Sequence, residues 1–148
     1  MSVALWFGVV VAAVSLAYNA RFSGATLSFG RALSDTSSGT GYQDAVTPPW
    51  QTKFVLIVYG LVLAVLALSW YGFGVGRAIA TLLVLILGSF VAYFLVPKQD
   101  SNHFRRLIIV SMSRRYADYV RDGDSVRADA MKMLLRKAGI DPDVIAGA

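Results

Sequence analysis

Two long apolar blocks dominate the pattern of hydrophobic and polar positions along this chain. Residues 54–71 and 78–96 contain no Asp, Glu, Lys, Arg or His. Each block is close to the roughly 17 to 25 residues that a helix needs to cross about 30 Å of hydrocarbon. The connector between them contains Gly72, Gly74 and Gly76, which permit a tight reversal of the chain. The pattern predicts a transmembrane hairpin of two helices.

A third apolar segment, residues 3–19, lies near the start of the chain. Its length is at the lower limit for a membrane span, and Trp6 and Tyr18 lie near its ends, where aromatic rings favour the membrane interface. We expect it to be the first of three transmembrane helices. A cleaved signal peptide is the alternative, because Ser15 and Ala17 could precede a cleavage point, although no Lys or Arg precedes the apolar run.

The region between the first two spans, residues 20–53, is rich in Ser, Thr, Gly and Asp, which predicts a long loop with a flexible linker over residues 34–41. Within it, residues 23–34 fit either a short amphipathic helix at the interface or loop residues that dip into the headgroups. Thr47, followed by two prolines, is a suitable start for the second span, since proline is tolerated in the first helical turn.

The segment after Pro97 has a helical pattern. We expect one helix from Ser101 or Asn102 to about Arg121, and a second that starts at Asp124 or Ser125 and ends near Gly139. The second helix carries an apolar stripe at i, i+4 spacing, which we expect to be an interaction face: Val126, Ala130, Leu134 and Ala138. A two-helix unit this small cannot bury a core alone, so it is expected to pack on the bundle or on another subunit.

These elements predict an all-α polytopic membrane protein. Residues 1–97 are expected to form the membrane domain, and residues 98–148 a cytoplasmic, amphipathic helical tail. Within the spans, small residues four apart allow close approach of helix backbones, so we expect helix packing at Ala4, Gly8, Ala12, Gly88 and Ala92. Thr81 and Ser89 are expected to bond to carbonyl groups of their own helix.

Charge suggests an orientation. Ten of the 14 Lys and Arg residues follow the last span, together with seven of the nine acidic residues. Because basic residues stay in the cytoplasm, we expect the C-terminus inside and the N-terminus outside. Arg outnumbers Lys ten to four and Glu is absent, a bias that suggests a bacterium, so the inner membrane of a bacterium is the expected location. The basic residues nearest the membrane are expected to contact anionic lipid headgroups: Lys98, Arg105, Arg106, Arg114 and Arg115.

Composition limits the chemistry. The chain has no cysteine, one histidine and a mean hydropathy of +0.57. His103 stands among basic residues, and the Asp122 and Asp124 pair lacks the Glu that completes a calcium loop. We therefore expect no catalytic residues, no metal and no cofactor, and we expect membrane lipid rather than nucleic acid as the anionic partner.

Three function classes remain open. The leading hypothesis is a non-enzymatic subunit of a larger bacterial inner-membrane complex, in a structural, assembly or scaffold role, such as secretion or energy-converting machinery. Copies of the chain or other membrane subunits are then its partners. The alternative is an oligomeric pore former, since the three spans and charged tail resemble the general plan of phage holins, although this tail is longer. A small transporter or channel is a third class.

Overall fold

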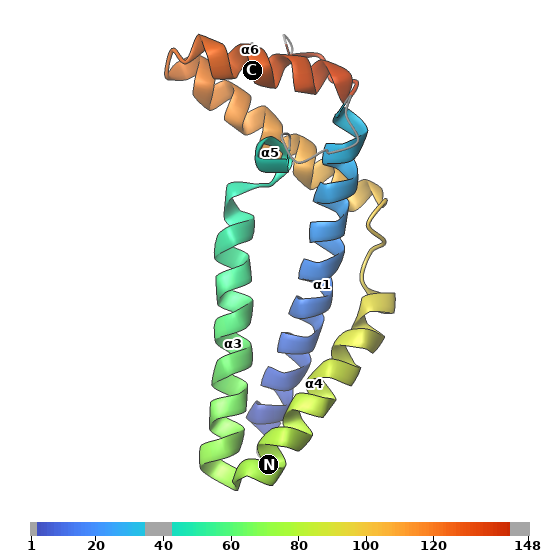
Figure 1. The fold of residues 1–148 in the computed structure, drawn as a ribbon, viewed down its shortest axis with the longest axis vertical. Coiled ribbons are helices and arrows are strands. Elements are labelled where there is room, and N and C mark those ends of the chain that lie inside the picture. Colours follow the sequence, from blue (N-terminus) through green and yellow to red (C-terminus); the bar gives the residue numbers. More distant parts are fainter. Residues whose placement is uncertain (1–2, 35–42, 143–148) are drawn as a thin grey trace. The chain divides into compact units, whose positions relative to one another are not determined.

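The computed structural model describes residues 3–34 and 43–142, and all regular structure in them is helical (Figure 1). The helices are α1 Val3–Leu33, α2 Gln43–Val46, α3 Pro49–Phe73, α4 Val75–Leu95, α5 Asn102–Arg121 and α6 Ser125–Lys137. Three of them, α1, α3 and α4, are long and apolar enough to cross a membrane. The predicted all-α class with three candidate membrane spans is therefore confirmed.

The chain divides into two compact units. Unit 1 comprises residues 1–23 and 49–99, and unit 2 comprises residues 24–48 and 100–148. The boundary near the N-terminus falls within α1, between Ser23 and Gly24. Residues 24–48 thus group with the C-terminal segment, whereas the division of the chain at residue 97 into membrane domain and tail stays a prediction.

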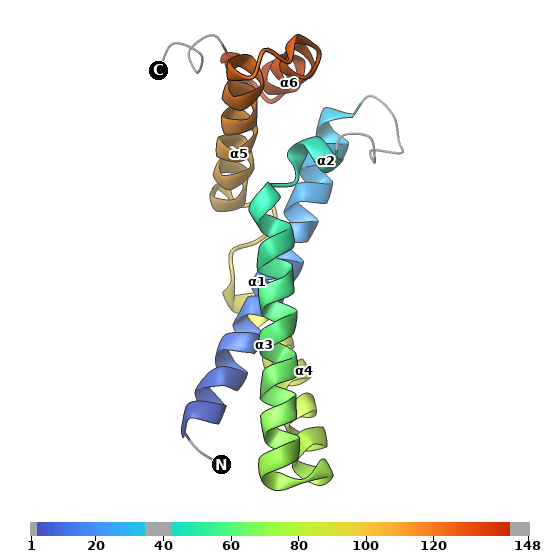
Figure 2. The ribbon, with the colours of Figure 1, turned by 90° about the vertical axis from the view of Figure 1, so that its left-hand side faces the viewer.

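The α3–α4 hairpin is the centre of unit 1 (Figures 1 and 2). Gly74 is the single residue between the two helices, and its φ of 82° lies in the left-handed region that glycine adopts without steric cost. Its N–H donates to the carbonyl of Trp70 over 2.8 Å, so the last turn of α3 is closed at the reversal. Gly72 and Gly76 have no such φ, so one glycine of the predicted three makes the turn.

Unit 1 buries several polar side chains and exposes many large apolar ones. The buried residues of α3 and α4 include Gln51, Ser69 and Thr81, whereas most large apolar residues of these helices face outward. Its apolar core forms where α1 meets the hairpin, and contains Leu5, Val9, Ala12, Ala13, Val65 and Leu85. This distribution is the one expected of a surface covered by lipid or by other membrane helices rather than by water.

The first helix differs from its prediction. α1 continues through Leu33, and α3 already begins at Pro49, so the loop is shorter than the predicted residues 20–53. Of the two alternatives for residues 23–34, the structure has a helix, which continues the first span instead of forming a separate short element. Gly24 and Ser28 have low helix propensity, but each such residue costs only about 0.5 to 1 kcal/mol. Burial of Ala25, Thr26 and Leu33 at helical spacing within unit 2 outweighs that cost. Of the predicted linker, residues 35–41 lie outside the described residues.

In unit 2, α5 and α6 pack side by side. The buried side chains of the two helices include Phe104, Ile108, Met112 and Tyr116 from α5 and Ala128, Met131, Leu134 and Leu135 from α6. Each helix closes with a glycine of positive φ, Gly123 and Gly139 respectively, and with the two backbone hydrogen bonds of a Schellman motif. The Asp124 side chain caps α6 by accepting from the N–H of Arg127 over 3.1 Å. The predicted bounds of both helices are confirmed.

Candidate functional site

Four of the five predicted helix-packing residues lie at contacts inside the chain. A Cβ added at Gly8 would lie 3.2 Å from Cγ2 of Val65 on α3, and one added at Gly88 would lie 3.4 Å from Cβ of Ala13 on α1. Ala12 and Ala92 are buried, whereas Ala4 is exposed. The small residues thus let α1 approach both helices of the hairpin closely. Their use against another chain stays a prediction.

Gly60, in the middle of α3, was not predicted as a packing residue. A Cβ added there would have no atom within 4 Å, and Ala64, four residues later, is also exposed. The same small-residue spacing that was noted in the other two spans therefore also occurs on the outer face of α3. The spacing of Gly60 and Ala64 is visible in the sequence. The sequence does not show that this face of α3 turns outward.

Hydroxyl groups join the two helices of the hairpin. Ser69 on α3 and Thr81 on α4 share a buried hydrogen bond of 3.0 Å between their side-chain oxygens. The prediction that Thr81 bonds to its own helix is therefore wrong, because a neighbouring helix offers a partner. Ser89 does donate to the carbonyl of Leu85 over 2.6 Å, as predicted.

Arg21 of α1 caps the end of α4. Its Nε and Nη2 atoms donate to the carbonyl oxygen of Tyr93 over 3.1 and 3.0 Å, and its guanidinium carbon lies 3.6 Å from the centre of the Tyr93 ring. The last carbonyls of a helix have no partner within the helix and carry the negative end of its dipole. A cation at this position satisfies both needs, and no sequence pattern predicted the pairing.

Aromatic rings gather at the same end of unit 1. Phe22 stacks on Trp50 with ring centres 5.0 Å apart, and Tyr18 meets Phe54 edge to face at 6.0 Å. Beside them, Nε2 of the buried Gln51 donates to Oγ of Ser23 over 3.1 Å. This end of unit 1 thus combines amphipathic rings with polar groups, the composition typical of a membrane–water interface.

The predicted headgroup residues fall into two groups. Lys98, Arg105, Arg106 and Arg114 are exposed, and none of their side chains forms an ion pair or hydrogen bond within residues 3–34 and 43–142. Arg115 instead donates to the carbonyl oxygens of Ala45 and Thr47 over 3.2 and 2.5 Å, so it ties α5 to the end of α2 within unit 2. Two of its donor atoms therefore serve contacts inside the chain, and its predicted role toward headgroups stays a prediction.

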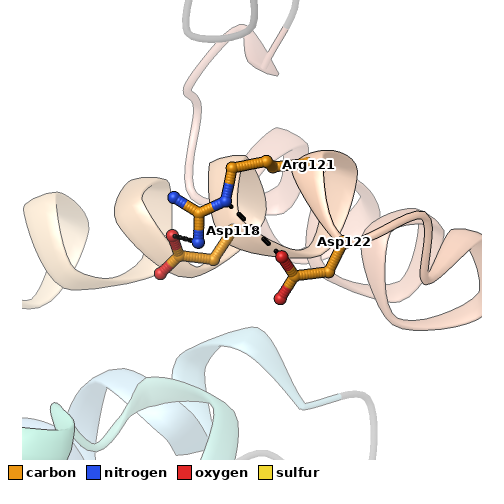
Figure 3. A network of polar contacts seen from close by, with 3 residues as sticks. All are labelled: Asp118, Arg121 and Asp122. Carbon is orange, nitrogen blue, oxygen red and sulfur yellow. Dashed lines mark hydrogen bonds and ion pairs between the residues drawn. The ribbon is translucent and has the colours of Figure 1, made fainter.

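Cations farther along α5 and α6 differ from these, because acidic neighbours compensate them. Arg121 lies between Asp118 and Asp122, with nitrogen–oxygen distances of 3.0 and 3.5 Å (Figure 3). Arg127 lies 3.4 Å from Asp124. The uncompensated charge of α5 therefore lies in its first three quarters.

The predicted stripe on α6 is split between two faces. Leu134 and Ala138 are buried, whereas Val126 is 79% exposed and Ala130 is also exposed. The buried face of α6 is rotated from the stripe and includes Ala128, Met131 and Leu135. Half of the stripe is thus core of unit 2, and its role toward a partner stays a prediction.

Candidate metal ligands do not come together in the part of the chain that the structure describes, where no group of three His, Cys, Asp or Glu could hold an ion. His103 is exposed, with its ring 5.4 Å from that of Phe104. Asp122 contacts Arg121, as described above.

Comparison of the chain with protein-family models, with curated proteins and with solved structures gives no match.

Proposed function

We propose that this chain is a non-enzymatic subunit of a bacterial inner-membrane complex, with a structural or assembly role. The observation that carries the proposal is the distribution of side chains in unit 1, where Ser69 and Thr81 are buried and bonded to each other while the outer faces of α3 and α4 are mostly apolar. Lipid or neighbouring membrane helices are the partners that such faces fit.

Open small-residue positions support a helix as one of these neighbours. Gly60 and Ala64 lie on the outer face of α3, where they leave room for a second helix backbone. The internal contacts of Gly8 and Gly88 leave those two glycines to the fold of the chain itself.

The proposed orientation places the N-terminus outside and the C-terminus in the cytoplasm. Its support is the distribution of basic residues about the three spans. Arg21, Lys53 and Lys98 lie at one end of unit 1, and Arg77 alone lies near the hairpin turn. The first end then faces the cytoplasm by the positive-inside rule.

An oligomeric pore resembling a phage holin is the second candidate, favoured by the number of spans and the basic tail. The hydroxyls of Ser69 and Thr81 bond to each other and that of Ser89 bonds to its own helix, so these groups do not line the outer faces of the hairpin. A water-filled pore needs polar lining, and the subunit proposal therefore ranks first.

Mild detergent extraction, followed by identification of the co-purifying proteins, tests the proposal. The unmodified chain is expected to migrate in native gels as part of a larger assembly, and Gly60→Leu to weaken that assembly because the added side chain separates helix backbones. Gly76→Leu is the matched control, since it adds the same bulk at an open position beside the turn.

Dye release from vesicles separates the two candidates. A monomeric chain without partners, or an unchanged assembly in the Gly60→Leu variant, contradicts the subunit proposal. Dye release by the purified chain alone would establish the pore instead.

A further inference from the structure

Unit 1 contains cations without any acidic residue. Its sequence holds Arg21, Lys53, Arg77 and Lys98, and no Asp or Glu. Three of these cations share one end of the unit. The Arg21 contact with Tyr93 joins α1 to the last turn of α4, and the stacking of Phe22 on Trp50 joins α1 to the first turn of α3. Lys53 lies one turn into α3, and Lys98 three residues after α4.

We propose that this end of unit 1 binds the phosphate of an anionic phospholipid, with Arg21 as its central ligand and Lys53 and Lys98 as flanking charges. This lipid site rests on one part of the proposed function, namely that the chain lies in a bilayer. It does not depend on a partner subunit.

The geometry of Arg21 prepares it to bind an anion. Two hydrogen bonds to one carbonyl and the contact with the Tyr93 ring hold the plane of the guanidinium. Its Nη1 atom has no hydrogen-bond partner within the described ranges. A guanidinium presents five N–H donors in a rigid fork, and phosphate is a ligand that this fork matches. Because the group is already ordered, binding costs little further side-chain entropy.

The two lysines are free to approach the same phosphate or its neighbours. Both are exposed, and neither has an ion pair or hydrogen bond in the ranges that the structure covers. Long basic side chains near the end of a span reach toward the headgroups while their methylene groups stay against apolar surface.

Neighbouring aromatic residues place this end at the depth of the headgroups. Trp50 is 38% exposed, and its ring and that of Tyr18 both contact Phe54. Tyr93 contacts Arg21 at the end of α4. Tyr and Trp concentrate at the two membrane interfaces. Phosphatidylcholine also carries a phosphate but is neutral overall, so three cations at one end of unit 1, with Asp100 after Lys98 as the nearest acidic residue in sequence, favour an anionic lipid.

Trp50 provides a local reporter of bound lipid. The chain has three tryptophans, and the other two, Trp6 and Trp70, are exposed and lie toward the other end of unit 1. The full chain with Trp6→Phe and Trp70→Phe is reconstituted in vesicles of phosphatidylglycerol and phosphatidylcholine, with one of the two lipids brominated in turn. Quenching of Trp50 fluorescence then gives the relative affinity for each lipid.

Phosphatidylglycerol is expected to bind about tenfold more tightly than phosphatidylcholine, which corresponds to one charge-assisted contact. Arg21→Lys keeps the charge but removes the fork, and is expected to lower this preference. The double variant Lys53→Gln with Lys98→Gln changes only exposed side chains, and is also expected to lower it. Arg77→Gln is the matched control, because the Arg77 guanidinium lies 4.9 Å from the centre of the Phe73 ring near the turn, away from the proposed site. The lipid preference of this variant is expected to equal that of the parent chain.

Three results would overturn the site. The first is equal quenching of Trp50 by both lipids in the parent chain. The second is a loss of lipid preference in Arg77→Gln as large as that in Arg21→Lys. The third is that inorganic phosphate relieves the quenching by brominated phosphatidylglycerol. The last result assigns the end to a soluble anion rather than a lipid. A chain that inserts and assembles but shows no lipid preference refutes this site alone, whereas a chain that fails to insert refutes the proposed function first.

Discussion

Ser69 and Thr81 form a buried hydrogen bond between α3 and α4, with 3.0 Å between their hydroxyl oxygens. Both side chains lie inside unit 1, where lipid offers no alternative partner. Such bonds in membrane proteins contribute about 0.6 kcal/mol on average and up to about 1.7 kcal/mol, because the separated helices also find partners.

The first prediction is a double-mutant cycle on this pair. Ser69→Ala and Thr81→Val are each expected to destabilise the folded chain by about 0.5 to 1.5 kcal/mol. Each change removes the hydrogen bond and leaves the other hydroxyl buried without this partner. The double variant is expected to cost less than the sum of the two, by about 0.6 kcal/mol. Unfolding in mixed detergent measures the free energies, and strict additivity would show that the bond contributes nothing.

The second prediction concerns the hairpin turn. Gly74→Ala is expected to destabilise unit 1 by about 1 to 3 kcal/mol, because a φ of 82° with a ψ of 173° is a backbone conformation that is nearly restricted to glycine. Gly72→Ala and Gly76→Ala add the same methyl group at open positions of ordinary φ. They are expected to stay within about 0.5 kcal/mol of the parent. Thermal unfolding in detergent compares the three, and equal effects would assign the reversal to the connector as a whole.

The third prediction separates the two halves of the α6 stripe. Leu134→Asp places a carboxylate in the core of unit 2 and is expected to cost about 3 kcal/mol or more, whereas Val126→Asp is expected to cost little. Limited proteolysis of the full chain measures the difference as faster cleavage between α5 and α6 in the first variant.

Equal protease resistance of the two variants would contradict the core assignment of Leu134. If Val126→Asp weakens the native assembly while unit 2 stays resistant, the exposed half of the stripe is a contact with a partner.

The fourth prediction is the orientation. A reporter that is active only outside the cytoplasm is expected to give no signal when fused after Ala148, and a strong signal when inserted after Gly74, which lies at the hairpin turn. The motive is the excess of basic residues at the opposite end of unit 1. The reverse pattern, from stable fusions, would invert the proposed topology.

The elements predicted best are those with a long, uniform signal. The hairpin and the two C-terminal helices follow from apolar length, helical spacing and glycine positions, and their bounds differ from expectation by a few residues. The extension of α1 to Leu33 was missed because Gly, Ser and Thr suggest a loop by local propensity. Burial of Ala25, Thr26 and Leu33, which requires the rest of the chain, decides the outcome.

Side-chain pairing was beyond the sequence for a different reason. Arg21 and Tyr93 are 72 positions apart, and Ser69 could have bonded to its own helix as Ser89 does. Spacing shows which residues share a face of one helix, but the rotation of one helix against another decides which faces meet. The same rotation leaves Gly60 outside while Gly8 and Gly88 face the interior.

The two ends of α4 are fixed, and this gives the chain a preferred bilayer thickness. Gly74 reverses the chain before the helix, and Pro97 follows Val96, where the backbone is already extended. The 21 residues between these limits span about 31 Å, close to the roughly 30 Å of hydrocarbon in a typical bilayer. A thicker membrane cannot be met by adding a helical turn. The mismatch is then taken up by local thinning of the lipid, by flanking side chains that reach to the interface or by association of spans, each at a cost of fractions of a kcal/mol per ångström. Membranes with longer acyl chains are therefore expected to hold this chain less favourably than membranes that match α4.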